Sequence, residues 1–127
     1  MIKKTRYLYW LPAILFASLI FYISGRSNPP GAELFSFLPA SDKLAHMAEY
    51  FILSMLIYLA FKKGHALKVS SAVLFSVVLA SLYGASDEFH QKFTPGRSMD
   101  ILDWLVDTAG AFVAMTGIFF KKTMNNR

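Results

Sequence analysis

The chain has 127 residues, a length typical of one domain, and 55% of them are hydrophobic whereas only 17% are charged, against about 25% charged residues in soluble domains. This composition argues against a soluble protein and predicts a single membrane domain over residues 1–127, and the absence of cysteine excludes disulfide frameworks and thiolate chemistry. The net charge of +5 does not indicate a nucleic-acid partner, because Lys and Arg beside membrane spans act first as topology signals.

Four apolar segments are long enough to cross about 30 Å of hydrocarbon, which takes about 17–25 helical residues. They predict an all-α bundle of four transmembrane helices over residues 8–24, 44–61, 69–86 and 101–120. Tyr7, Tyr9 and Trp10 open the first segment as an interfacial aromatic belt. A cleaved signal peptide is the alternative for this segment, but its apolar run is longer than a usual signal core and no small-residue cleavage site follows.

The segments between the spans are short and rich in turn residues. Residues 26–41 contain three prolines and a glycine, and their apolar side chains predict a short helical turn at the membrane interface. Ser41 is expected to cap the second helix. The third helix is predicted to continue past its span to Gln91, where Thr94, Pro95 and Gly96 stop it.

Basic residues are distributed unevenly between the two sides of such a bundle. Nine of the thirteen fall on the side of the termini and the second loop, and four on the other side. The positive-inside rule therefore predicts that both termini are cytoplasmic. All eight carboxylates fall on the opposite, outer half, so that nearly every group capable of chemistry lies there.

The second predicted helix begins with polar residues that lie one turn apart on its surface. They are Asp42, Lys43, His46, Glu49 and Tyr50. On the third helix the corresponding stripe contains Tyr83, Asp87 and Gln91, with Glu88 beside it. The sequence therefore predicts that two helices bring polar faces to the same end of the bundle.

The fourth helix has the most regular pattern, with intervals of three and four residues along one face. Its members are Asp100, Asp103, Asp107, Gly110, Ala114 and Gly117. Small residues on one seam predict close packing against another helix. Asp107 lies about 10 Å inside the span, at about 1.5 Å per residue. Because an intramembrane carboxylate is costly in lipid, Asp107 is a candidate functional residue.

Two interpretations of this polar cluster stay open. In the first, Lys43 and Arg97 neutralise the acids in an interhelical ion-pair network. In the second, the excess of eight acids over four bases is balanced by protonation or by a divalent cation. The proposed metal ligands are His46, Asp87, Glu88 and Asp103. Oxygen ligands alone suit Mg²⁺ or Ca²⁺, whereas a histidine ligand favours Mn²⁺ or Zn²⁺.

Several of these residues are candidates for binding a ligand or for acid–base chemistry on it. His46 and Glu88 are candidate acid–base groups. Lys43 and Arg97 are candidate phosphate contacts, since the turn after the third helix presents the Arg97 guanidinium at the membrane surface. The alternative is that the turn after the third helix only ends the helix and has no role in binding.

The polar motifs resemble those of the VanZ-like family. Residues 42–50 are similar to its D-K-x-x-H-x-x-x-Y opening, residues 87–97 to its D-E-x-x-Q…P-G-R segment, and residues 103–110 to its D-x-x-x-N-x-x-G ending. Asp107 stands where that family usually has asparagine, which adds a titratable group. The resemblance implies a small multi-pass protein of the bacterial cytoplasmic membrane, and it associates the name-giving members with resistance to the glycopeptide teicoplanin.

We consider three hypotheses for function. The first is an outer-leaflet pocket that binds or chemically modifies a polar membrane lipid or a lipid-linked cell-envelope precursor, with Asp42, Glu49, Tyr50, Tyr83, Gln91, Asp103 and Asp107 among its ligand-binding residues. The second is a noncatalytic shielding protein that binds an envelope ligand. The third is a small ion-coupled transporter, which is less favoured because the sequence has no inverted repeat and no broken helix on the cytoplasmic half.

Overall fold

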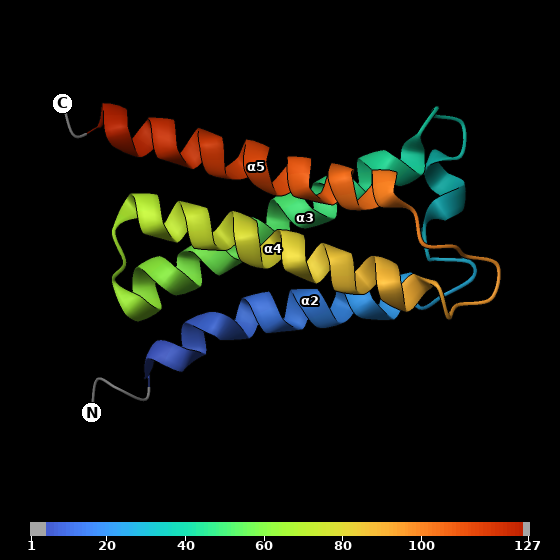
Figure 1. Ribbon diagram of the computed structural model, residues 1–127, viewed down its shortest axis with the longest axis horizontal. Helices are drawn as coiled ribbons and strands as arrows, with labels where there is room; N and C mark the ends of the chain where they lie inside the picture. The colour runs from blue at the N-terminus through green and yellow to red at the C-terminus, as the bar shows by residue number, and fades with distance from the viewer. Residues whose placement is uncertain (1–4, 126–127) are drawn as a thin grey trace.

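A computed structural model describes residues 5–125, apart from the side chains of Ala32 and Phe35, and the described chain is all-helical (Figure 1). A 3₁₀ turn η1 (Arg6–Trp10) leads into helix α2 (Leu11–Ser24), and a second 3₁₀ turn η2 (Ala32–Phe35) precedes α3 (Ser41–Leu59). A π-helical turn η3 (Ala60–Gly64) extends α3, and α4 (Val69–Gln91) and α5 (Ile101–Met124) complete the chain. Four of these helical stretches are long and apolar enough to cross a membrane, which confirms the predicted fold class.

The helix boundaries differ from the predicted spans mainly at their ends. The second helix begins at Ser41, three residues before the predicted span, and its N-cap is Ala40 in the left-handed conformation, without a side-chain hydrogen bond. The expectation that Ser41 caps this helix is therefore wrong. The third helix ends at Gln91 as predicted. The fourth continues to Met124, and Asp100 caps its start by accepting a hydrogen bond from the Leu102 N–H at 2.8 Å.

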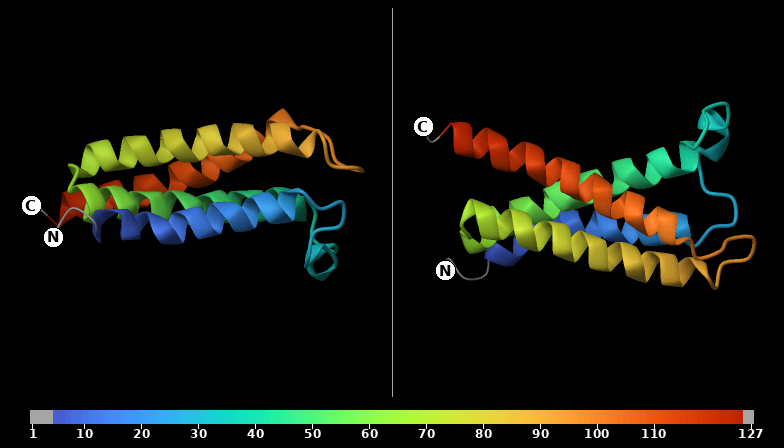
Figure 2. Two further views of the ribbon diagram at one scale, coloured as in Figure 1. Left: turned by 90° about the horizontal axis from the view of Figure 1, so that it is seen from below. Right: turned by 45° about the horizontal axis from the view of Figure 1, so that its top comes forward.

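Helices α3 and α5 cross each other in close contact (Figure 2, right). The contact depends on Gly110, because a Cβ atom at that position would lie only 2.3 Å from the carbonyl oxygen of Met47. Ala111 and Ala114 are buried in the same interface region. The predicted small-residue seam therefore packs as far as Ala114. Gly117 does not belong to it, since this residue is exposed and a Cβ atom added there would have no neighbour within 4 Å.

Helix α4 has a buried stripe that changes character along its length. Small residues at intervals of four form the first part, namely Ala72, Ser76, Ala80 and Gly84. Buried polar residues continue it: Asp87, Glu88 and Gln91. The small residues let α4 approach its neighbours closely, and the same packing carries the polar part of the stripe into the interior of the bundle.

Helix α2 lies against α3 and α4 and is mostly exposed on its other side, with only Ala13, Ile20 and Ser24 buried. A hydrogen bond links α2 to α4: the Tyr83 hydroxyl donates to the Ala17 carbonyl oxygen at 2.6 Å. The exposed side is apolar, as expected of a helix that faces lipid.

The two ends of the bundle have different chemistry. The segments 25–40 and 92–100 lie together at one end, whereas η1, the 60–68 turn and the end of α5 lie at the other (Figure 1). We call the first of these the loop end. The carboxylates of α3, α4 and α5 all belong to the half of the bundle near the loop end, whereas Lys121 and Lys122 lie near the other end.

Candidate functional site

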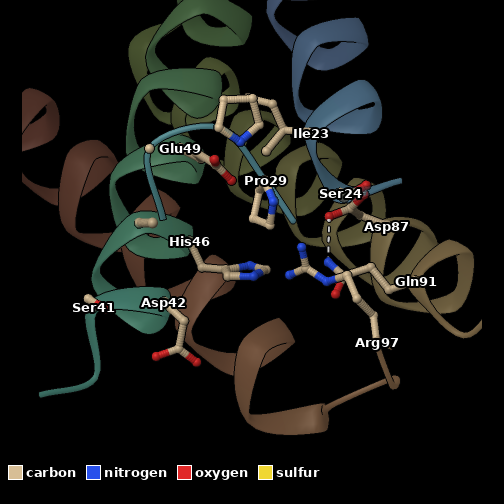
Figure 3. A pocket seen from close by; sticks show the side chains of 13 residues that line it. Ile23, Ser24, Pro29, Ser41, Asp42, His46, Glu49, Asp87, Gln91 and Arg97 are labelled. Atoms are coloured by element: carbon tan, nitrogen blue, oxygen red, sulfur yellow. Dashed lines mark hydrogen bonds between the residues drawn. The ribbon is translucent and has the colours of Figure 1, made fainter. Parts of the chain in front are cut away.

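A cavity of about 270 Å³ opens at the loop end, between α2, α3 and α4 (Figure 3). Its volume is near the lower limit of typical small-molecule sites. Apolar groups such as Ile23, Pro29, Pro30 and Ala45 form part of its lining. The polar side chains that line it are Ser24, Ser41, Asp42, His46, Glu49, Asp87, Gln91 and Arg97.

Glu49 and Arg97 supply opposite charges to the cavity, and neither is paired within it. Glu49 makes no hydrogen bond or ion pair of 4.0 Å or less with any described residue, although the Arg97 charge acts on it at longer range. The Arg97 guanidinium donates only a long hydrogen bond of 3.5 Å, to the Arg26 carbonyl oxygen. Figure 3 shows this guanidinium pointing into the cavity from the loop that follows α4. Both groups are therefore available to a ligand.

Both carboxylate oxygens of Asp87, in contrast, accept hydrogen bonds. The Ser24 hydroxyl donates to Asp87 Oδ1 at 2.5 Å, and Gln91 Nε2 donates to Asp87 Oδ2 at 3.3 Å. The Ser24 bond joins the end of α2 to α4 and closes one side of the cavity (Figure 3). Asp87 therefore acts mainly as a structural acceptor that positions the cavity wall.

His46 connects the cavity to a buried carboxyl group on α5. Its Nδ1 lies 2.9 Å from Asp107 Oδ1, and its Nε2 lies 3.9 Å from Asp103 Oδ2. Asp107 is completely buried, and its second oxygen Oδ2 has no hydrogen-bond partner in the described part of the chain. The same holds for the hydroxyl of Tyr50, one turn after His46 on α3.

Lys43 forms ion pairs with carboxylates at the start of α5. Its Nζ donates to Asp103 Oδ1 at 2.5 Å and to Asp100 Oδ2 at 3.3 Å. The pKa of Asp100 is lowered, first by the hydrogen bond from the Leu102 N–H and then by Lys43. The ion-pair interpretation thus holds for Lys43. It does not hold for Arg97, which has no carboxylate within 4.0 Å among the described residues.

The structure divides the site residues proposed from sequence into three places. Asp42, His46, Glu49, Asp87, Gln91 and Arg97 line the cavity. A second group lies behind His46 and contains Lys43, Tyr50, Glu88, Asp103 and Asp107. Tyr83 belongs to neither group, although its ring centroid lies 6.3 Å from that of Tyr50. Its hydroxyl donates to Ala17, and its ring lines a separate apolar cavity of about 170 Å³ beside α2.

Sequence reasoning missed several residues of the cavity. Ser24 is the last residue of an apolar span and has no feature that separates it from the rest of that span, and the 29–31 segment is predicted only as a loop. A hydroxyl at the polar end of an otherwise apolar helix is the signal that could have identified Ser24.

Comparison with known proteins gives one result that identifies the chain. No curated protein and no solved structure matches it significantly. A family model described as VanZ/LLP1, however, matches residues 7–122. This match covers every residue that lines the cavity and all of the four spans except Arg6, Thr123 and Met124. The chain therefore belongs to the VanZ/LLP1 family and is a VanZ-like multi-pass membrane protein.

Proposed function

We propose that the cavity at the loop end binds the zwitterionic headgroup of a membrane lipid or of a lipid-linked cell-envelope precursor. The observation that carries this proposal is the pair of unmatched opposite charges in one cavity, Glu49 and Arg97. A planar guanidinium suits a phosphate, and a carboxylate suits an amine. A headgroup that carries both groups would satisfy Glu49 and Arg97 together.

The position of the cavity favours a lipid over a soluble ligand. The apolar outer side of α2 would face acyl chains, while Ile23 and Ser24 at the end of the same helix line the cavity. A lipid beside α2 could therefore place its headgroup in the cavity and keep its chains in the bilayer. Asp42 and Gln91 would add polar contacts to the headgroup.

His46 is the residue we propose for any chemical step on the bound headgroup. Its imidazole lines the cavity, and the Asp107 carboxyl group orients it through Nδ1, an arrangement that suits an acid–base group. Glu88 does not line the cavity and would act only through its neighbours. A purely binding role, which would shield an envelope ligand, uses the same contacts without His46 chemistry.

We place the loop end on the outer side of the bacterial cytoplasmic membrane, because in the sequence the two terminal segments and the 62–68 segment carry nine basic residues and no acid. Any contribution to glycopeptide resistance, the property associated with the name-giving members, would act from this side.

The topology is testable because the chain contains no cysteine. Single cysteines at Asn28 and Ser98, both exposed at the loop end, should react with a membrane-impermeant thiol reagent in intact cells. Cysteines at Lys63 and Asn125, exposed at the other end, should react only after the cells are opened. The reverse labelling pattern would place the cavity in the cytoplasmic leaflet.

Headgroup binding is tested by titrating the purified protein in detergent with short-chain phosphatidylethanolamine, which carries phosphate and amine. Arg97→Gln and Glu49→Gln should each weaken binding about tenfold, which corresponds to about 1.4 kcal/mol. Lys92→Gln and Glu33→Gln change the same charges on exposed residues outside the cavity and should leave the affinity unchanged. Short-chain phosphatidylglycerol, which lacks the amine, should bind less tightly and be insensitive to Glu49→Gln.

Equal affinity of the wild type and both cavity variants for phosphatidylethanolamine would rule out this headgroup. A lipid-linked precursor then remains as the second source of the same chemistry, and the same four variants are titrated with it.

A further inference from the structure

His46 and two buried carboxyl groups form a cluster that headgroup binding does not require, although His46 is also the residue proposed above for chemistry on the headgroup. One nitrogen of His46 and one carboxylate oxygen each of Glu88 and Asp107 lie within 4.8 Å of one another, and all three residues are buried. We propose that His46, Glu88 and Asp107 hold a divalent transition-metal ion between α3, α4 and α5. The proposal rests on this cluster and is independent of what the cavity binds.

The spacing of the three groups is close to that of a coordination shell. Zinc–nitrogen and zinc–oxygen bonds are about 2.0–2.2 Å long, so that two ligands of a tetrahedral zinc ion lie about 3.3–3.6 Å apart. His46 Nδ1 and Asp107 Oδ1 are 2.9 Å apart, the distance of a hydrogen bond, and would separate by about half an ångström on binding the ion. Small side-chain rotations would bring the carboxylate of Glu88 into the same shell.

Two unpartnered polar atoms, one on a proposed ligand and one beside it, also indicate a missing partner. Asp107 Oδ2 and the Tyr50 hydroxyl belong to completely buried side chains, and neither has a hydrogen-bond partner in residues 5–125. The two side chains converge at Gly84, where a Cβ atom would lie 3.1 Å from Asp107 Oδ2 and 3.3 Å from Tyr50 Cε1. Buried polar atoms are rarely left unsatisfied. A metal ion and its bound water would supply partners for both.

The charges around the cluster favour a cation. Lys43 is engaged by Asp103 and Asp100, and Arg97 makes no ion pair with a described carboxylate. Glu88 and Asp107 therefore have no Lys or Arg partner within 4.0 Å in the described chain. Uncompensated carboxylates at membrane depth are costly, and a divalent ion would neutralise both.

Glu88 is also oriented in the way expected of a metal ligand. Gln91 Nε2 donates to Glu88 Oε1 at 3.3 Å, and the Asp100 backbone N–H donates to Glu88 Oε2 at 3.0 Å. Hydrogen bonds of this kind fix the direction of ligating carboxylates. One imidazole with two carboxylates favours Zn²⁺ or Mn²⁺ over Mg²⁺.

This set differs from the one proposed from sequence in two residues. Asp87 is bound by Ser24 and Gln91, and Asp103 is bound by Lys43. Asp107, which the sequence suggests only as a ligand-binding residue, takes their place.

The experiment measures metal content and affinity of the full-length protein, purified without a polyhistidine tag and treated with a chelator. Samples are equilibrated with Zn²⁺, Mn²⁺ or Mg²⁺ alone, without added lipid, and the metal that remains after gel filtration is quantified. Wild type should retain about one equivalent of Zn²⁺ or Mn²⁺. Glu88→Gln and Asp107→Asn should lower the affinity at least about 100-fold, whereas the exposed control Glu33→Gln should bind as wild type does.

Wild-type protein without stoichiometric metal would overturn the proposal whatever the variants do. Retention of the metal by Glu88→Gln and Asp107→Asn would also overturn it, as would an equal loss of metal in Glu33→Gln. Because a variant can fail to fold, X-ray absorption of the wild-type zinc complex is a second measurement, and it should show nitrogen and oxygen ligands that include one imidazole. No lipid is present, so failure here leaves headgroup binding intact, and failure of headgroup binding leaves this site intact.

Discussion

Gly110→Ala is expected to destabilise the protein by about 3 kcal/mol, the upper part of the range for overpacked interiors. The added methyl group would lie 2.3 Å from the Met47 carbonyl oxygen. This neighbour is backbone and cannot rotate away, so α3 and α5 must move apart. The measurement is unfolding of the purified protein in mixed detergent micelles, monitored by loss of helical signal.

Gly117→Ala is the matched control, since it makes the same change on the same helix. Nothing lies within 4 Å of the new methyl group, and alanine in a helix is about 0.5–1 kcal/mol more favourable than glycine. This variant should be as stable as wild type or more stable. Equal destabilisation by the two substitutions would contradict the close contact between α3 and α5 at Gly110.

His46→Leu is expected to have the second large effect. Asp107 is completely buried, and its only hydrogen-bond partner among the described residues is His46. Removing one member of a buried pair costs about 3–5 kcal/mol, because the other is left without compensation. The same micelle unfolding assay measures this loss.

A second substitution separates the loss of pairing from the loss of packing. In His46→Leu combined with Asp107→Leu, the carboxyl group that lost its partner is also removed, so the double variant should recover much of the stability lost in His46→Leu. His65→Leu, at an exposed histidine of the opposite end, should have little effect. A double variant less stable than His46→Leu would show that Asp107 is not the source of the penalty.

The sequence predicted those features of the site that follow from spacing along one helix. Intervals of three and four placed Asp103, Asp107 and Gly110 on one face of α5, and all three are buried. The same spacing rule placed Asp87 and Gln91 together on α4, and both line the cavity. Helical periodicity fixes such relations before any tertiary contact forms.

Relations between helices could not be predicted in this way. Tyr83 and Asp87 lie one turn apart and both hydrogen-bond to α2, Tyr83 to the Ala17 carbonyl oxygen and Asp87 to the Ser24 hydroxyl. Only Asp87 lines the cavity, because the cavity opens at the end of α2 that carries Ser24. Which carboxylate forms an ion pair with Lys43 also depends on how α3 crosses α5. That crossing is set by the approach of Gly110 to Met47, and no spacing within one helix determines it.

The most direct test of headgroup binding is to identify what lies in the cavity inside a membrane. A photoreactive amino acid is introduced at Ala45, which lines the cavity, and in a second protein at Phe112, which is exposed on α5 outside it. Each protein is irradiated in native membranes, and its adducts are identified by mass spectrometry. We predict that Ala45 gives adducts with a phosphate- and amine-bearing headgroup that are absent from Phe112 and that are lost with Arg97→Gln. Identical adducts from both positions, or adducts at Ala45 that persist in Arg97→Gln, would contradict headgroup binding in this cavity.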